Sequence, residues 1–461
     1  QGLDNGDGNG TAADGQLHVD EIDSLALICP NLMLLINSGS SSIKADGLTA
    51  VGNTLYFRAN DGTNGDELWK SNGTASGTVM VKDINSGSSS SSPDYLIAVG
   101  NTLYFQATDG TNGTELWKSD GTASGTVMVK DIVSGSGYGS LDELTAVGNA
   151  LYFEAYDTTY GKALWKSDGT ANGTVMVKDI YSGSDTSSPL DQLTAVGNTL
   201  YFSGTDGTNG YELWKSDGTA SGTVMVKDIR SGSSHSYPSY LTAVGNTVYF
   251  QASDGTNGTE FWKSDGTSAG TVMVKDIYSG SGSSNPAWFA AIGNTLYFSA
   301  NDGANGNELW KSDGTASGTV MVKDIYSGSS SSSPFELTAV GNTLYFSASD
   351  GTNGYELWKS DGTASGTVMV KDIHSGSSHS NPAWFAAIGN TLYFRANDGI
   401  NGTELWKSDG TSSGTAMVKD IYSGSRSSNP AWFAAIGNTL YFSTTEGFGT
   451  NDIDLWFYLP S

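Results

Sequence analysis

The chain is poor in cysteine and in positive charge. Cys29 is its only cysteine, so no disulfide can form within the chain, and the fold must be held by packing and hydrogen bonds. The 22 Lys and Arg residues are outnumbered by 48 Asp and Glu residues, which gives a formal net charge of -26. Because nucleic acids and anionic membrane surfaces are bound through Lys and Arg, this composition argues against both as partners.

Long apolar runs are also missing. The most apolar stretch, residues 25–36, is too short to span a bilayer and is interrupted by Pro30, so we expect no membrane insertion. The chain begins at Gln1 rather than at methionine, which favours a processed and exported product. Only 15% of the residues are charged, and the many Ser and Gly residues suit an extracellular or cell-surface protein.

What the chain does contain is one sequence unit repeated nine times. The motif Glu-Leu-Trp-Lys-Ser-Asp-Gly-Thr marks the units, and its tryptophans are spaced by 48 to 50 residues. So regular a period indicates one supersecondary unit that stacks on its neighbours, and its length suits a four-stranded propeller blade. The marking residues are Trp69, Trp117, Trp165, Trp214, Trp262, Trp310, Trp358, Trp406 and Trp456.

The seventh unit predicts four antiparallel strands. Apolar residues 337–340 end at a Gly-Asn turn, and residues 343–349 are rich in β-favouring side chains. After a Gly-containing loop, residues 355–360 carry the tryptophan, and residues 367–373 follow an Asp-Gly hairpin turn. Apolar residues occupy both faces of these strands, which favours blades packed between neighbours over an open sheet. We therefore interpret each repeated tryptophan as a packing residue between blades.

The two ends of the chain predict a closed ring. The ninth unit stops after Trp456 and lacks a fourth strand, whereas residues 32–36 resemble the fourth strand of the other units. A strand supplied by the opposite end of the chain hides the edges that an open solenoid, the alternative, would leave exposed. We therefore predict an all-β, nine-bladed β-propeller of four-stranded antiparallel blades over residues 31–461, with residues 32–36 completing the last blade.

The repeated motif resembles that of the ELWxxDGT-repeat family of bacterial secreted and surface proteins. In the second unit it spans residues 115–122, and the resemblance extends over residues 41–461. It implies a propeller-like repeat domain and export, and it supplies no catalytic residue or substrate. The third unit departs from the pattern, since Ala163 stands where most units have glutamate. We infer that this glutamate is not required in every blade.

Residues 1–30 predict a separate acidic segment with a candidate calcium loop. The stretch from Asp14 to Glu21 resembles the second half of an EF-hand loop, in which Glu21 would supply a bidentate carboxylate. Asp7 and Asn9 lie upstream, as if the loop were lengthened, while glycine and alanine occupy positions where ligands belong. A short helical pattern follows and ends at a proline. A flexible acidic tail is the alternative.

The other carboxylates recur from blade to blade in turns. Asp120 and its equivalents suit hairpins in which the side chain binds its own backbone. Asp350, Asn353 and Glu356 carry oxygens that suit calcium, with turn formation as the simpler interpretation. The four histidines show no spacing typical of a catalytic triad or a metalloprotease, so we expect a protein that is not an enzyme.

Three units carry a tryptophan that the others lack. Trp288, Trp384 and Trp432 each follow an Asn-Pro-Ala sequence at the end of a linker. At the junction of a linker and an inner strand, these rings would line the mouth of the propeller, where flat sugar faces can stack. Repeated sites of this kind would add avidity. Core packing beneath the linker is the alternative.

These patterns give two functional expectations from different classes. The first is a secreted, non-enzymatic propeller that acts as an extracellular structural or interaction scaffold and associates with itself. The second is a multivalent carbohydrate-binding lectin or adhesin that uses the tryptophan-bearing blades. Glycans or further copies of the chain are the expected partners, and calcium is the one cofactor that the sequence suggests.

Overall fold

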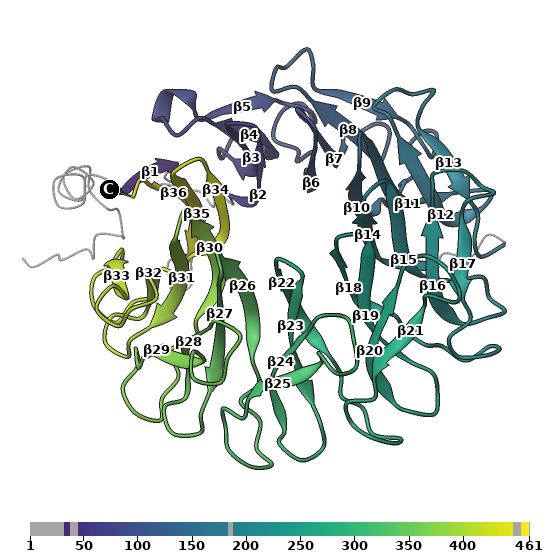
Figure 1. The fold of residues 1–461 in the computed structure, drawn as a ribbon. Coiled ribbons are helices and arrows are strands. Elements are labelled where there is room, and N and C mark those ends of the chain that lie inside the picture. Colours follow the sequence, from purple (N-terminus) through teal and green to yellow (C-terminus); the bar gives the residue numbers. More distant parts are fainter. Residues whose placement is uncertain (1–31, 37–44, 183–187, 446–452, 461) are drawn as a thin grey trace, which may run out of the picture.

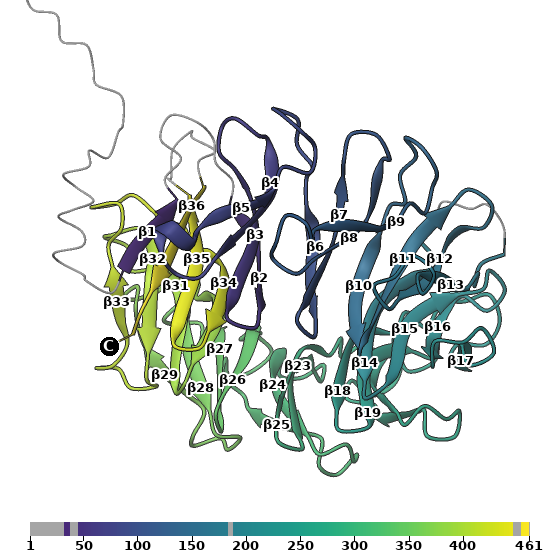
Figure 2. The ribbon, with the colours of Figure 1, turned by 90° about the horizontal axis from the view of Figure 1, so that it is seen from above.

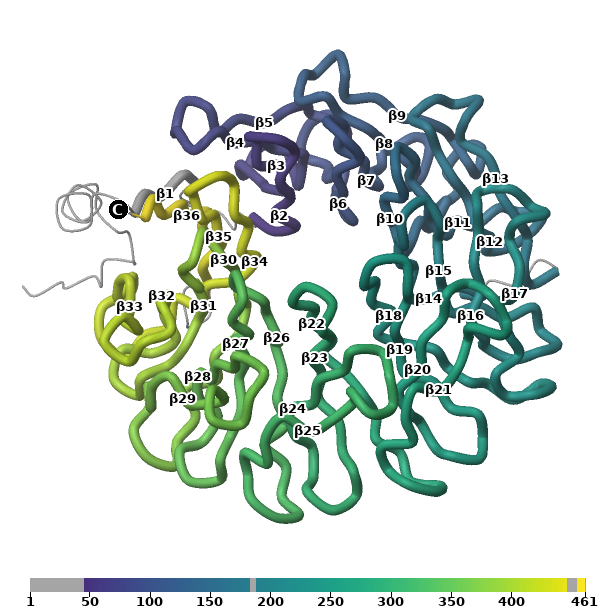
Figure 3. Tube along the Cα trace, viewed as in Figure 1, coloured from purple at the N-terminus to yellow at the C-terminus, as the bar shows by residue number. Residues whose placement is uncertain are grey.

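The computed structural model describes residues 32–36, 45–182, 188–445 and 453–460. Over these residues the chain forms nine four-stranded antiparallel sheets, arranged as blades around a central axis (Figure 1). Figure 2 shows the ring from the side, with strands running across its thickness. The tube in Figure 3 follows the chain once around the axis. The predicted all-β, nine-bladed propeller is therefore confirmed.

Each blade begins with a strand next to the axis and builds outward from it (Figure 1). The innermost strands are β2 (Asp46–Val51), β6 (Asp94–Val99), β10 (Asp142–Val147), β14 (Leu190–Val196), β18 (Ser239–Val244), β22 (Ala287–Ile292), β26 (Phe335–Val340), β30 (Ala383–Ile388) and β34 (Ala431–Ile436). The second strands are β3 (Thr54–Asn60), β7 (Thr102–Thr108), β11 (Ala150–Asp157), β15 (Thr199–Thr205), β19 (Thr247–Ser253), β23 (Thr295–Asn301), β27 (Thr343–Ser349), β31 (Thr391–Asn397) and β35 (Thr439–Thr445).

The outer half of each blade contains the tryptophan strand and an edge strand. The third strands are β4 (Asp66–Ser71), β8 (Thr114–Ser119), β12 (Gly161–Ser167), β16 (Tyr211–Ser216), β20 (Thr259–Ser264), β24 (Asn307–Ser312), β28 (Tyr355–Ser360), β32 (Thr403–Ser408) and β36 (Ile453–Tyr458). The outermost strands are β5 (Val79–Lys82), β9 (Val127–Lys130), β13 (Val175–Lys178), β17 (Val224–Lys227), β21 (Val272–Lys275), β25 (Val320–Lys323), β29 (Val368–Lys371), β33 (Ala416–Lys419) and, for the last blade, β1 (Leu32–Ile36).

The described part of the chain contains little helical structure. Within the described residues, the 3₁₀ turn η1 (Ala75–Gly77) is the single helical element. No helix in this part of the chain has the length and apolar character needed to cross a bilayer.

The predicted strands of the seventh unit agree closely with the observed ones. β27 and β28 have the predicted bounds, β26 begins earlier, at Phe335, and β29 is confined to Val368–Lys371. The hairpin before β29 depends on Gly362, whose φ is +86°. A Cβ at this position would collide with the hydroxyl of Tyr297 from the preceding blade. Both backbone conformation and space therefore require glycine here.

The hydrophobic core lies between blades rather than within them. Each of nine clusters of buried residues combines side chains from two successive blades. Between blades six and seven, Tyr297 packs with Phe346 and Trp358, and Trp358 is only 5% exposed. Lys323 Nζ lies 5.7 Å from the Trp358 ring centroid and donates to the Thr367 carbonyl at 2.8 Å. The predicted packing role of the repeated tryptophans is confirmed.

The ring closes through the N-terminal strand. β1 pairs antiparallel with β36, with Leu34 opposite Trp456, and Figure 1 shows the purple β1 beside the yellow β36. The core continues across the junction, since Phe457 of the last blade packs in one cluster with Phe57 of the first. The predicted closure by residues 32–36 is therefore confirmed, and an open solenoid is excluded.

The candidate calcium loop falls outside the described residues. Asp7, Asn9, Asp14 and Glu21, together with the helix expected to follow them, all belong to residues 1–31. The calcium site and the separate N-terminal segment therefore stay predictions.

Candidate functional site at the axial bulges

Every inner strand carries a β-bulge near its start. In β30 the register shifts between Ala383 and Ala386, so that Trp384 and Phe385 together oppose one residue of β31. The first of the two bulge residues has a left-handed backbone in all nine blades, with φ between +52° and +65°. We call these nine positions the bulge ring: Gly47, Tyr95, Glu143, Gln192, Tyr240, Trp288, Glu336, Trp384 and Trp432.

The bulge ring is a set of strained positions. A left-handed backbone favours glycine, and Gly47 alone supplies it. A bulky residue in this conformation costs about 1–3 kcal/mol, yet five of the positions hold Tyr or Trp. The residue after it is Leu or Phe in every blade, whereas the bulge position varies among Gly, Tyr, Trp, Glu and Gln. We infer that the large side chains are kept at these positions for a purpose other than stability.

The three predicted tryptophans all belong to the bulge ring. Trp288 and Trp432 are 44% and 43% exposed, and Trp384 is half-buried. The ring centroids of Trp384 and Trp432 lie 5.5 Å apart, with the planes inclined by 50°. Trp288 instead lies against Phe335 of the next blade, with 6.2 Å between centroids. The structure thus brings two of the three rings together and leaves the third apart.

Polar members of the bulge ring reach along the ring to the next blade. A carboxylate oxygen of Glu143 accepts from the backbone N–H of Leu193 at 3.1 Å. The side-chain oxygen of Gln192 accepts from the backbone N–H of Tyr240 at 2.9 Å. In these two blades the bulge side chain therefore contacts the bulge of the next blade.

The glutamate of the repeated motif is buried and structural. Glu356 is 0% exposed, and its carboxylate accepts from the backbone N–H groups of Ile373 at 2.8 Å and Ser380 at 3.1 Å, and from the Ser380 hydroxyl at 2.7 Å. These donors belong to the linker that leads to the next blade. Burial raises the pKa of Glu356 to about 7, although the hydrogen bonds oppose the shift. The glutamate therefore fixes the path of the chain between blades.

The raised pKa values predict a pH-dependent stability. Burial raises the pKa from an ordinary value of 4.5 to about 7 for Glu115, Glu212, Glu356 and Glu404. The folded chain therefore binds these protons more tightly, and their contribution to stability is complete below pH 4.5 and is lost as the pH rises through 7. We expect the melting temperature, followed by circular dichroism, to fall between about pH 5 and about pH 8. The fall should be smaller for Glu356→Gln, and an equal fall in both proteins would contradict the assignment.

The third blade keeps the buried carboxylate although it lacks the motif glutamate. Glu154 of β11 is 0% exposed and accepts from the Ser188 hydroxyl at 2.7 Å and the Leu190 backbone N–H at 3.2 Å. It also pairs with Lys162 at 2.8 Å. The motif position is dispensable, as inferred, but its function is not, because a carboxylate on the neighbouring strand replaces it. The signal in the sequence was that Glu154 and Lys162 depart from the repeat together with Ala163.

The recurrent aspartates are turn residues, as predicted. Asp120 Oδ1 accepts from the backbone N–H of Thr122 at 2.9 Å. Asp350 uses both carboxylate oxygens within its own loop, accepting from the backbone and side-chain amides of Asn353 at 2.8 Å. Glu356 faces the linker, so it does not join Asp350 and Asn353 in a cation site. Across the described ranges, no three His, Cys, Asp or Glu residues cluster in a way that could hold a metal ion.

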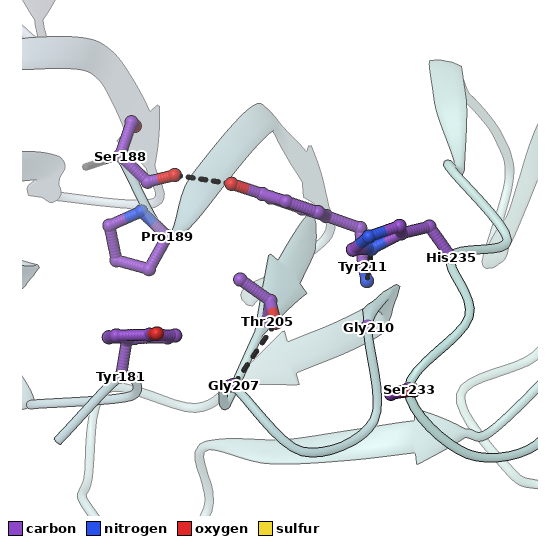
Figure 4. A pocket seen from close by; sticks show the side chains of 9 residues that line it. All are labelled: Tyr181, Ser188, Pro189, Thr205, Gly207, Gly210, Tyr211, Ser233 and His235. Carbon is purple, nitrogen blue, oxygen red and sulfur yellow. Dashed lines mark hydrogen bonds between the residues drawn. The ribbon is translucent and has the colours of Figure 1, made fainter.

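A cavity of about 250 Å³ lies in the fourth blade, with Tyr181 and Pro189 on one side and Tyr211 and His235 on the other (Figure 4). The Tyr211 hydroxyl donates to the Ser188 carbonyl at 2.6 Å, and His235 Nδ1 accepts from the Tyr211 backbone N–H at 2.9 Å. Serine hydroxyls accept the same N–H in other blades. His235 therefore has a structural role that a hydroxyl also fulfils.

Comparisons with known proteins found similarity to solved structures only. No family model matches the chain, and no curated protein matches it. Among solved structures it is similar to the computationally designed protein Ika8, with 16% identity, a TM-score of 0.44 and coverage of 79% of this chain and 95% of that one. It is also similar to Sqt1 of Saccharomyces cerevisiae, with 11% identity, a TM-score of 0.40 and coverage of 78% and 93%.

A structure from a study of two prolyl endopeptidases is similar at 12% identity and a TM-score of 0.43, with coverage of 77% of this chain. The chain spans about half the length of that peptidase, covering 55% of it. These likenesses assign no activity to the chain.

Proposed function

We propose that this protein is a non-enzymatic, extracellular β-propeller that acts as an interaction scaffold. The bulge ring supports the proposal, because it keeps large and partly exposed side chains at strained positions that glycine satisfies in the first blade. The repeated glutamates and aspartates are already used in linkers and turns. The bulge ring both varies between blades and carries exposed aromatic side chains, so it is the surface that we expect to contact a partner, and self-association is one outcome that such a surface permits.

A multivalent lectin is the second candidate, and the tryptophans favour it. Trp384 and Trp432 form an inclined pair with centroids 5.5 Å apart, and Trp288 exposes a further ring at an equivalent position. Exposed aromatic faces suit sugars, which present apolar C–H faces. Several such positions around one axis would combine weak sites into useful avidity.

Substitution of Trp384 by glycine tests the lectin function. We expect Trp384→Gly to lose binding on a glycan array by about 30-fold or more, because aromatic anchors carry most of the energy of such contacts. The fold should persist, since Gly47 occupies the same position in the first blade. Tyr138→Gly removes an aromatic side chain that is 65% exposed and lies outside the bulge ring, so this control should bind as the parent chain does. A blank array, together with filaments or sheets in electron micrographs, would favour the scaffold over the lectin.

A further inference from the structure

Arg395 is a cation beside the bulge ring that pairs with no other described residue. It lies on β31 opposite Ala383, the residue that precedes Trp384. Its side chain is half-buried, and within the described ranges its guanidinium forms no hydrogen bond and no ion pair. Burial lowers the pKa of Arg395, and the charge of Glu336 opposes the shift without forming an ion pair. An arginine in this state is prepared to receive an anion.

The first blade contains the same arginine with its anion in place. Arg58 is the equivalent of Arg395 and lies opposite Asp46. The Asp46 carboxylate accepts from Arg58 Nε at 2.7 Å and from an Arg58 terminal nitrogen at 2.6 Å. This two-point contact is the geometry that an arginine offers to a carboxylate. Asp46 thus shows where a carboxylate sits on this arginine of the repeat.

Two of the differences between the eighth blade and the first lie opposite or next to this arginine. Ala383 replaces Asp46, which removes the carboxylate and leaves room in its place. Trp384 replaces Gly47, which adds an aromatic ring at the next position. Relative to the first blade, the eighth blade therefore lacks a carboxylate and has an aromatic ring at the next position. Blades six and nine have the same alanine and tryptophan opposite Ser299 and Ser443, so the eighth blade alone combines them with an arginine.

The arginine and the tryptophan pair lie at the same boundary between blades. Side chains alternate along a strand, so Arg395 is on the face of β31 that also carries Tyr393. Tyr393 packs in the core between blades eight and nine. Trp384 and Trp432 meet across this boundary as well, with their centroids 5.5 Å apart.

We propose that Ala383, Trp384, Arg395 and Trp432 form a site for a carboxylate-bearing sugar, that is, a uronic acid residue of an acidic glycan. The Arg395 guanidinium binds the sugar carboxylate at the place that Asp46 takes in the first blade, and the tryptophan rings contact the sugar face. This proposal rests on the lectin function and names its ligand class.

Charge favours a uronate over a more densely charged polymer. Glu336 lies near enough to act on Arg395, and the chain carries a net charge of -26. Both oppose a polymer with several negative charges on each sugar, such as a heavily sulfated chain, more strongly than a polymer with one charge on each sugar. A single carboxylate on each sugar matches one arginine, while the Glu336 carboxylate is able to accept from a sugar hydroxyl.

Isothermal titration of the full chain with a galacturonic acid oligomer tests the ligand class. The fully methyl-esterified oligomer of the same length is the control, because it keeps the sugar rings and loses the negative charge. We expect the acid form to bind about 10- to 100-fold more tightly than the ester, as is typical of a hydrogen-bonded charged pair.

Three variants test which residues cause the tighter binding of the acid oligomer. Arg395→Gln should reduce binding of the acid to the level of the ester. Ala383→Asp should do the same without removing the arginine, because it rebuilds the internal pair of the first blade. Arg58→Gln changes the net charge by the same amount outside the site and should bind as the parent chain does. Melting curves show that each variant is folded.

The outcomes separate this site from the lectin function itself. Equal binding of acid and ester by the parent chain, or full binding of the acid by Ala383→Asp, would overturn the uronate site. If glycan binding still disappears in Trp384→Gly, the lectin function survives that result. If the parent chain binds no glycan of any kind, both proposals are wrong.

Discussion

Deletion of residues 1–36 is expected to destabilise the last blade by about 3–5 kcal/mol and to make the chain associate. β1 is the outer strand of that blade and pairs along β36, with Leu34 opposite Trp456. Its removal breaks several backbone hydrogen bonds, each worth about 1 kcal/mol. It also exposes an unpaired strand edge, which is a template for pairing with another copy.

Deletion of residues 1–31 is the matched control, because it removes the preceding segment and keeps β1. Light scattering coupled to size exclusion measures association, and thermal unfolding measures stability. We expect the shorter deletion to behave as the full chain does and the longer one to melt earlier and to form dimers or larger species. A longer deletion that stays monomeric with an unchanged melting temperature would show that closure does not depend on β1.

Glu356→Ala is expected to lower the free energy of unfolding by about 3–5 kcal/mol. The carboxylate receives three close hydrogen bonds from Ile373 and Ser380 in a fully buried setting. Alanine leaves the buried Ile373 N–H without an acceptor, which costs about 1–3 kcal/mol. It also removes two hydrogen bonds from Ser380, each worth about 1 kcal/mol, although the Ser380 N–H and hydroxyl keep the Tyr355 carbonyl as an acceptor. Glu356→Gln keeps an acceptor and should cost less. Denaturant unfolding monitored by tryptophan fluorescence gives both values.

The third blade supplies a rescue for this variant. Ser347 and Tyr355 of blade seven correspond to Glu154 and Lys162 of blade three. A triple variant with Ser347→Glu, Tyr355→Lys and Glu356→Ala therefore transfers the alternative carboxylate and its lysine. We expect it to regain most of the stability that Glu356→Ala loses. If the triple variant is no more stable than the single one, the two carboxylates are not equivalent.

The architecture could be predicted because the same strand pattern recurs in nine units, so that an ambiguous strand in one unit is resolved by the others. Nine copies of one strand pattern give the same answer nine times, and the bounds of β27 and β28 were predicted to the residue. Closure was predictable because residues 32–36 and the incomplete last unit complement each other. β26 was predicted too short because its first residues belong to the bulge, where alternation of side chains breaks down.

The candidate site was only partly predictable. Trp288, Trp384 and Trp432 stood out as departures from the repeat, but nothing in a tryptophan suggests a left-handed backbone, which its Cβ opposes. The strain is imposed by the bulge and by the packing of the blade around it. The role of Arg395 could not be predicted from the sequence either. Only the structure shows that the equivalent Arg58 pairs with Asp46, for which the eighth blade has Ala383.

The placement of each hydrophobic cluster between two blades has a consequence for assembly. Because the nine junctions are built from nearly the same side chains, a blade surface does not identify its proper neighbour. The order of blades around the axis is therefore enforced by covalent connection and by the short reach of the linkers, and not by molecular recognition. Folding of one blade after another during synthesis favours contacts between successive blades. Refolding from denaturant at high protein concentration instead favours contacts between blades of different molecules.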